Sequence, residues 1–237
     1  SNKVFQYDIP TDSWTLLTNL PNSQGREQMR STLINDSTVL LTGGISSVAS
    51  ALTHPASTYV YHTNSNTFTF TGNLPNGMIN HTSTLLPNGE VLITGGFDGN
   101  AALEDVHVFN LQSGWRTLSS FLSLAVSAHR ALLINGKVYI YGGFNIPLFQ
   151  FSNHLDVYDP VDDTIMPLGT GPLACSQFAM VSFNSSILIA GGNTLLPNSS
   201  FGATDEAYRY DINSNTFSVL PGLPAPRSGT ELAGIGS

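Results

Sequence analysis

Residues 91–96, Val91-Leu92-Ile93-Thr94-Gly95-Gly96, join an apolar strand to a glycine pair and decide the fold of this chain. The same pattern, four mostly apolar or β-branched residues followed by Gly-Gly, recurs at 39–44, 138–143 and 187–192. Successive glycine pairs are 52, 47 and 49 residues apart. A self-similar period near fifty residues predicts a repeat architecture, in which each repeat is one small unit of packed strands.

The residues around each glycine pair predict four short strands per repeat, named a to d in chain order. In the second repeat, strand a covers 81–86 and strand b covers 91–94, because the intervening Asn88-Gly89 favours a tight hairpin turn. Strand c covers 106–109 after a variable loop, and strand d begins at Trp115. An aromatic residue ends strand c and an apolar residue opens strand d at each repeat: Tyr7 and Trp14, Tyr61 and Phe68, Phe109 and Trp115, Tyr158 and Ile165, Tyr210 and Phe217.

Such a meander has two apolar faces, and units stacked radially around an axis bury those faces against one another. The chain is therefore predicted to be all-β: a single β-propeller domain or segment over 1–237, with four complete four-stranded blades and a split or partial fifth. The ring either closes through that split blade or is part of a larger ring, and we favour the second arrangement. The blade repeats lie near 21–72, 73–119, 120–169 and 170–220, and the partial blade combines 1–20 with 221–237.

The repeat resembles the kelch repeat of the kelch and galactose-oxidase-like propellers. The resemblance rests on the glycine pairs, on Tyr-Asp turns such as Tyr158-Asp159, on the later Trp115, and on Pro226-Arg227-Ser228-Gly229, which is similar to the start of an innermost strand. The departures are Phe68, Phe217 and Ile165 where Trp is usual, and His62 and Asn110 where Asp is usual. The resemblance implies that the glycines and ring aromatics are structural and that the commoner role is binding another protein through loops.

Composition narrows the classes of partner. Charged residues make up 10% of the chain, the net charge is −8, and Lys3 and Lys137 are the only lysines, so a nucleic-acid partner is not expected. No apolar stretch is long enough to cross a bilayer, so membrane insertion is not expected. Cys175 is the single cysteine, which excludes an internal disulfide. Low lysine content and polarity supplied by uncharged residues lean towards a secreted, extracellular setting, in which four Asn-x-Ser/Thr triplets would carry glycans.

Because strands alternate in direction, the a–b and c–d turns share one end of the ring and the b–c and d–a loops share the other. The turns are short and alike, whereas the b–c loops differ in length and content. Variation gathered at one end of a rigid ring predicts a recognition surface there. We therefore expect a non-catalytic interaction module that binds a protein through these loops. The b–c loops cover 45–57, 97–104, 144–154 and 193–206.

Two sets of loop-end residues are candidate binding residues. Apolar side chains gather on the d–a loop before the third complete repeat and on the b–c loop of that repeat, and they form either a partner-binding patch or a small satellite core. Residues near the start of strand a are expected to line the channel mouth, either to bind a carboxylate or sugar acid or to form a satisfied polar rim. The patch comprises Phe121, Leu124, Phe144, Leu148, Phe149 and Phe151, and the channel-mouth set comprises Arg26, Arg30, His81, His129, Arg130, Gln177 and Arg227.

The sequence offers no catalytic set. The six histidines share no metal-ligand spacing, so neither a metal nor another cofactor is expected. The resemblance leaves an alternative open: part of a carbohydrate-active or galactose-oxidase-like propeller enzyme, or a secreted glycan-binding propeller. Carbohydrate is therefore the second class of partner, after protein.

Overall fold

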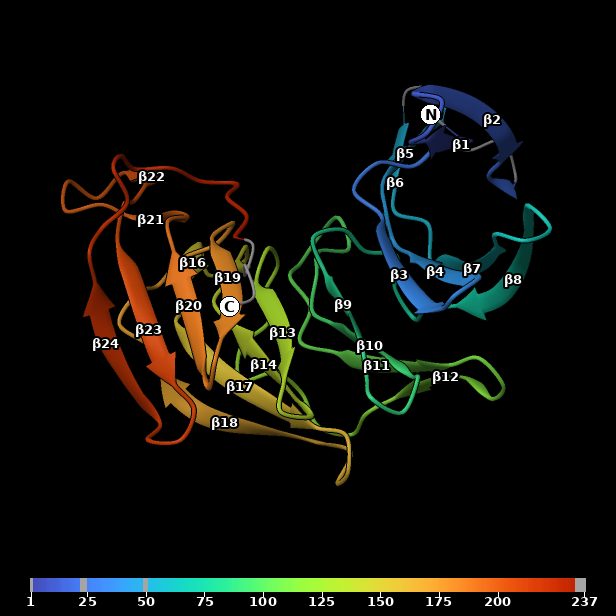
Figure 1. The fold of residues 1–237 in the computed structure, drawn as a ribbon. Coiled ribbons are helices and arrows are strands. Elements are labelled where there is room, and N and C mark those ends of the chain that lie inside the picture. Colours follow the sequence, from blue (N-terminus) through green and yellow to red (C-terminus); the bar gives the residue numbers. More distant parts are fainter. Residues whose placement is uncertain (1, 22–24, 49–50, 233–237) are drawn as a thin grey trace.

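The computed structural model describes residues 2–21, 25–48 and 51–232, and every named element in these residues is a β-strand. Four four-stranded antiparallel sheets follow one another around an arc, each with its first strand innermost (Figure 1). This arrangement confirms the predicted all-β propeller class. No helix in the described residues is long and apolar enough to cross a membrane.

The four complete blades share one strand order, from the inner to the outer edge of the sheet. They are β3 (Arg30–Asn35), β4 (Thr38–Thr42), β7 (Ser57–His62) and β8 (Thr67–Asn73) in blade 1; β9 (Thr82–Leu85), β10 (Val91–Thr94), β11 (Val106–Asn110) and β12 (Gly114–Thr117) in blade 2; β13 (Arg130–Ile134), β14 (Lys137–Tyr141), β17 (His154–Asp159) and β18 (Thr164–Thr170) in blade 3; and β19 (Ala179–Phe183), β20 (Ser186–Ala190), β23 (Ala207–Asp211) and β24 (Thr216–Leu220) in blade 4.

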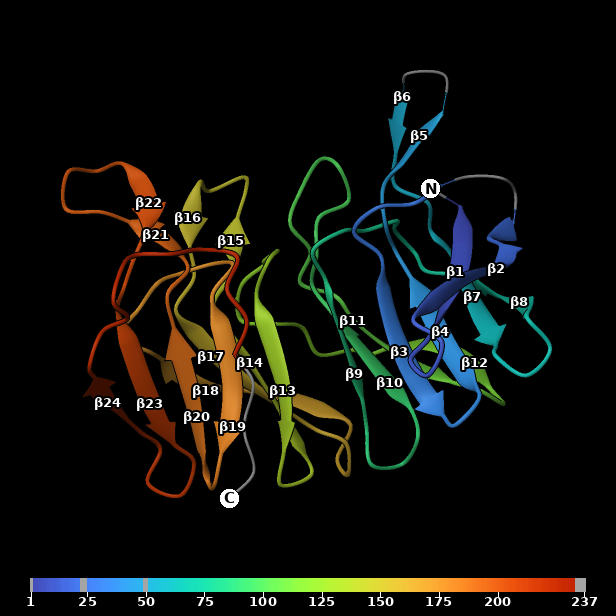
Figure 2. The same cartoon turned by 45° about the horizontal axis from the view of Figure 1, so that its top comes forward.

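Three of the b–c loops form small hairpins, which stand on the same side of the arc (Figure 2). Ahead of blade 1, the first two strands pair antiparallel and, within the described residues, only with each other. The last residues of the predicted partial blade, 233–237, lie outside the described residues, and the number of blades stays a prediction. The hairpins are β5 (Ser46–Val48) with β6 (Ala51–Thr53), β15 (Phe144–Asn145) with β16 (Gln150–Phe151), and β21 (Asn193–Leu195) with β22 (Phe201–Ala203); the first pair is β1 (Lys3–Asp8) with β2 (Ser13–Asn19).

The glycine pair forms the joint between two blades. In blade 2, Gly95 and Gly96 have φ of 54° and 116°, a region that side chains strongly disfavour. A Cβ on Gly95 would lie 2.6 Å from the carbonyl oxygen of Val126, at the start of blade 3. The amide of Gly96 donates to that same oxygen at 2.9 Å. The repeat therefore needs glycine here because the backbone of the next blade lies directly against it.

The c–d turns use a second recurring device. Asp163 adopts a left-handed φ of 55°, and the hydroxyl of Tyr158, five residues earlier, donates to its carboxylate at 2.7 Å. Where Phe109 replaces the tyrosine, no hydroxyl is available, and Gly114 takes the left-handed position instead. The turn residue is thus matched to its aromatic partner. The tyrosine-supported turn recurs at Tyr7 and Asp12, Tyr61 and Asn66, and Tyr210 and Asn215.

The core lies between blades rather than within one sheet. Leu92 and Val108 of blade 2 pack with Val138 and Tyr158 of blade 3 in one buried cluster, and similar clusters lie between blades 1 and 2 and between blades 3 and 4. Complete burial of such a side chain contributes about 1.5–3 kcal/mol. In contrast, β1 and β2 expose large apolar side chains such as Trp14, which is 69% exposed.

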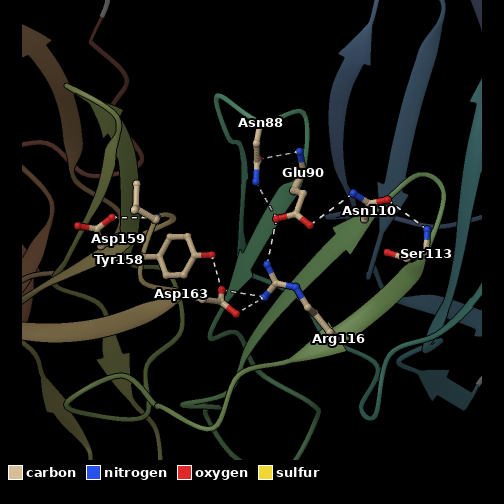
Figure 3. A network of polar contacts seen from close by, with 9 residues as sticks. Asn88, Glu90, Asn110, Ser113, Arg116, Tyr158, Asp159 and Asp163 are labelled. Carbon is tan, nitrogen blue, oxygen red and sulfur yellow. Dashed lines mark hydrogen bonds and ion pairs between the residues drawn. The ribbon is translucent and has the colours of Figure 1, made fainter.

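At the turn end, charged residues tie blade 2 to blade 3. Arg116 on β12 forms an ion pair with Glu90 in its own blade at 2.9 Å, and its Nη1 donates to both carboxylate oxygens of Asp163 in the next blade, at 2.8 and 2.7 Å (Figure 3). Asn110 adds a longer hydrogen bond to Glu90 at 3.4 Å. Within this network, the charged side chains therefore neutralise one another.

Candidate recognition site

Four phenylalanines from two blades meet at the loop end, and we call them the aromatic cluster: Phe144, Phe149 and Phe151 from hairpin β15–β16, with Phe201 from β22. The ring of Phe201 lies 4.9 Å from Phe149 and 5.0 Å from Phe151, measured between ring centroids. Phe144 lies 4.9 Å from Phe151. The hairpins of blades 3 and 4 are therefore joined through their aromatic side chains.

The cluster has a buried base and an exposed tip. Phe151 is 7% exposed, whereas Phe149 is 70% exposed. Phe149 also has a φ of 54° and closes a turn by donating its amide to the carbonyl of Ile146 at 3.1 Å. A bulky residue in the left-handed region is strained by roughly 1–2 kcal/mol. The tip therefore combines backbone strain with an exposed aromatic ring.

A pocket of about 400 Å³ lies beside the aromatic cluster, and we call it the aromatic pocket. The four phenylalanines line it together with uncharged polar residues that include Ser127, Ser176 and Gln177. Its chemistry is an apolar wall beside hydroxyl and amide groups. Such a surface suits a bulky apolar side chain whose flanking backbone needs hydrogen-bond partners.

The other predicted patch residues lie apart from the aromatic cluster or beside it. Leu124 packs against the buried cluster between blades 2 and 3. Phe121 is 51% exposed and makes no ring contact with the cluster among the described residues. Its loop is held elsewhere, because the amide of Ser123 donates to the buried carboxylate of Asp156 at 3.0 Å. Leu148 is 62% exposed beside Phe149 at the hairpin tip.

Sequence reasoning did not single out Phe201. Asn198, Ser199 and Ser200 separate it from the other large apolar residues of the b–c loop of blade 4, so no aromatic clustering marks it. The useful signal is topological, because b–c loops of successive blades are neighbours in a propeller. Comparing residues at equivalent places in adjacent loops would have paired Phe201 with Phe149, because each lies two residues before the strand partner of the residue that follows the glycine pair.

The channel mouth is organised by a run of backbone hydrogen bonds. Ala128 donates its amide to the carbonyl of Asn80 at 2.9 Å, Gln177 donates to Ala128 at 3.1 Å, and Gly229 donates to Gln177 at 2.8 Å. All four residues have a positive φ between 53° and 65°. This run fixes where each inner strand begins. It therefore fixes the side chains that open those strands.

Four of the predicted channel-mouth residues border one pocket of about 200 Å³, the channel-mouth pocket: Arg30, His129, Arg130 and Gln177. Glu231 borders it too, and Nη2 of Arg130 donates to its carboxylate at 2.6 Å. Nε of Arg130 donates to the carbonyl of Phe178 at 2.7 Å. The channel-mouth pocket and the aromatic pocket share Asn80, Ala128 and Gln177, so the two are contiguous.

Each of the two predicted histidines uses one ring nitrogen to join its blade to the preceding blade. Nε2 of His81 lies 2.8 Å from Oγ1 of Thr42 in blade 1, and Nε2 of His129 lies 2.8 Å from Oγ1 of Thr94 in blade 2. Both rings are buried, and burial, helped by the charge of Arg30, lowers the pKa of each to about 3. They are therefore neutral at physiological pH.

Arg26 and Arg227 do not line the channel-mouth pocket. Arg26 donates to the carbonyl of Ser57 at 2.8 Å, and its guanidinium carbon lies 5.6 Å from the ring centroid of Tyr59. Arg227 is the structural equivalent of Val126 at the start of blade 3. The carbonyl of Arg227 accepts a hydrogen bond from the amide of Gly192, as the carbonyl of Val126 does from Gly96. That place lies at the joint between blades, away from the channel.

The described residues contain no group of three or more His, Cys, Asp or Glu side chains placed to hold a metal ion. The single cysteine, Cys175, is completely buried, and burial raises the pKa of its thiol well above the usual range. An inert core position explains both observations.

Comparisons with known proteins agree with this architecture. The family model of the KLHDC2/KLHL20/DRC7 Kelch-repeats domain matches residues 32–237. The chain is 28% identical over 179 residues to Kelch repeat and BTB domain-containing protein 2 of Ectromelia virus (strain Moscow), which is 69% of this chain and 31% of the relative. It is 23% identical over 258 residues to Kelch-like protein 15 of Danio rerio, covering 99% of this chain and 41% of that protein.

The chain thus spans less than half of the length of these curated relatives. Among solved structures, that of YjhT superposes with a TM-score of 0.65 at 18% identity, covering 86% of this chain and 67% of YjhT, which supports the propeller fold. None of these names supports the carbohydrate-binding, oxidase-like or secreted alternatives.

Proposed function

Since this chain belongs to the kelch-repeat family, we propose that it is a protein-interaction module whose docking site is the aromatic cluster and the pocket beside it. The observation that carries the proposal is Phe149. Its ring is 70% exposed, and its backbone is held in the left-handed region. Strained non-glycine residues persist where they serve a function, because stability alone would favour glycine or asparagine at such a turn.

The geometry fits a partner that contributes one bulky apolar side chain. A pocket of about 400 Å³ has room for a side chain of the size of leucine or phenylalanine. Burying such a side chain against the exposed rings of Phe149 and Phe201 contributes about 1.5–3 kcal/mol. Aromatic anchors of this kind often dominate the binding energy of an interface. The hydroxyl and amide groups of Ser176 and Gln177 supply hydrogen bonds for the backbone of the partner.

The proposal is tested with peptides selected from a random library on the wild-type chain, then measured by fluorescence polarisation against variants. Phe149→Gly is expected to lower their affinity at least tenfold while the free energy of unfolding stays within about 1 kcal/mol of wild type, because lost ring contacts and relieved strain oppose each other. Phe183→Ser is the matched control, since Phe183 is 52% exposed on β19 at the turn end.

A satellite core predicts the opposite pattern. In that case Phe149→Gly would lower the free energy of unfolding by several kcal/mol, as large-to-small changes in a core do, and the folded fraction would bind the peptides as wild type does. Equal losses of affinity in Phe149→Gly and Phe183→Ser would also reject the docking site.

A further inference from the structure

Two arginines occupy the same place in different blades. Arg30 opens β3 and Arg130 opens β13, each two residues after a residue with positive φ, and both border the channel-mouth pocket. The equivalent positions in blades 2 and 4 hold Thr82 and Ala179, which carry no charge. A quarter of the eight Lys and Arg residues of an acidic chain therefore converge on one pocket of about 200 Å³.

The two arginines differ in the hydrogen-bond acceptors that surround their guanidinium groups. Arg130 has the carboxylate of Glu231 at 2.6 Å. Nε of Arg30 donates to the carbonyl of His81 at 2.9 Å, but among the described residues no carboxylate forms an ion pair with Arg30. Burial and the positive charge of Arg130 lower the pKa of Arg30, and the negative charge of Glu231 opposes this only in part.

Arg116 at the turn end shows what a compensated arginine looks like in this chain. It donates to two carboxylates, through Nη1 to both oxygens of Asp163 and through Nη2 to Glu90 (Figure 3). Arginine pairs readily with carboxylates, because its planar guanidinium presents several donors at once. Among the described residues, the channel-mouth pocket has one carboxylate for two guanidinium groups. That carboxylate, on Glu231, belongs to a side chain that is 75% exposed and is therefore easily displaced.

We propose that the channel-mouth pocket is a carboxylate subsite of the docking site, and that Glu231 is its internal competitor. The inference rests on the proposed function and adds the chemistry of the partner: a peptide with an acidic side chain close to the bulky apolar residue that enters the aromatic pocket. The contiguity of the two pockets through Asn80, Ala128 and Gln177 places both features within one short segment. Glu231 shows that a carboxylate can reach Arg130.

The test compares pairs of selected peptides that differ only in Glu against Gln beside the apolar anchor. Arg30→Gln is expected to lower affinity for the Glu peptide about tenfold and to leave affinity for the Gln peptide unchanged, as for the loss of a charge-assisted hydrogen bond. Glu231→Gln is expected to raise affinity for the Glu peptide severalfold, a gain that an unfolded variant cannot produce. Arg116→Gln, at the turn end, is the matched control and is expected to change neither affinity.

The possible failures are distinguishable. If Phe149→Gly abolishes binding but Glu and Gln peptides bind equally, the carboxylate subsite is wrong and the docking site stands. If Phe149→Gly has no effect, the docking site itself is wrong. If free succinate or inorganic phosphate displaces the Glu peptide at a concentration equal to the dissociation constant of that peptide, the pocket binds a small free anion as tightly as it binds the peptide. The peptide inference is then overturned.

Discussion

The two ends of this propeller use polar and apolar groups in opposite ways. At the turn end, Arg116 is bonded to two carboxylates and Tyr158 supports the strained turn at Asp163 (Figure 3). At the loop end, Phe149 is exposed on a strained hairpin, and Arg30 has no carboxylate among the described residues. The same repeat produces both ends, so the contrast does not come from the fold itself.

What the contrast teaches is how to separate structural from functional residues in a repeat protein. Groups that are satisfied by equivalent partners in most blades maintain the ring, as the tyrosine-supported turns do. Groups that differ between blades and remain exposed or incompletely compensated are available to a partner. Each prediction below tests one side of this comparison.

The largest effect is expected at the joint between blades. Gly95→Val would place a Cβ 2.6 Å from the carbonyl oxygen of Val126 and force a β-branched residue to a φ of 54°. We expect the free energy of unfolding to fall by about 3 kcal/mol or more, since a backbone clash and a forbidden φ combine. Urea denaturation measures this change.

Gly89→Asn is the control for that experiment. Gly89 also has a positive φ, of 83°, but no heavy atom lies within 4 Å of a Cβ built there, and asparagine tolerates this region. A loss below about 1 kcal/mol is expected. Equal losses in the two variants would mean that φ, and not the close approach of the next blade, explains the glycine pair.

A second prediction concerns the buried histidines under the loop end. Their pKa of about 3 lies below the value near 6.5 expected in the unfolded chain, so the unfolded state binds protons first as pH falls. The stability these groups contribute is complete above pH 6.5 and is lost progressively below it, by up to about 1.4 kcal/mol per pH unit for each histidine.

His129→Phe tests this mechanism with a substitution that the chain itself uses, because Phe178 has the equivalent place in blade 4. The slope of stability against pH between 6.5 and 5 is expected to fall by about a third to a half, since His81 remains and burial also lowers the pKa of the buried His107. Chemical denaturation at several pH values measures it. An unchanged slope would show that other groups cause the acid sensitivity.

Much of the architecture could be predicted because its signals are local and repeated. The glycine pairs and the aromatic residue that ends strand c recur in all four complete blades, and the Asn-Gly turn recurs in blades 2 and 3. Strand b, predicted at 91–94 in blade 2, is observed as Val91–Thr94. The kelch resemblance is confirmed by the family model, whereas the number of blades and the roles of the site residues stay predictions.

The candidate site was harder to predict, because it depends on where side chains from different blades meet. Phe201 is the only aromatic residue in the sequence of its loop, and only the packing of hairpins from blades 3 and 4 brings it to Phe149. Arg26 and Arg30 are four residues apart, yet Arg26 turns towards Tyr59 in its own blade while Arg30 borders the channel-mouth pocket. Sequence spacing alone does not distinguish these two environments.

A smaller effect is expected at the turn end from Tyr158→Phe. The variant keeps the buried ring and removes the hydroxyl that donates to Asp163 at 2.7 Å. We expect a loss of about 1 kcal/mol, the usual net contribution of one hydrogen bond. The double variant with Asp163→Gly should recover part of that loss, because glycine adopts the φ of 55° without support, as Gly114 does beside Phe109. Additive losses in the double variant would contradict the matching of aromatic and turn residue.

The smallest effect is expected from Arg116→Gln, although this residue makes the most ion pairs. Its side chain is 40% exposed and that of Asp163 is 46% exposed, so water and salt screen the attraction. A loss of about 0.5 kcal/mol, falling further in 1 M salt, is expected for such a pair. Denaturation at low and high salt measures it. A loss of several kcal/mol that persists in high salt would mean that the turn-end network holds blades 2 and 3 together. The contrast between the turn end, where charged groups are paired, and the loop end, where groups remain exposed, would then need a different explanation. The ion-pair network would in that case be a main source of stability, and not only a set of charges that neutralise one another.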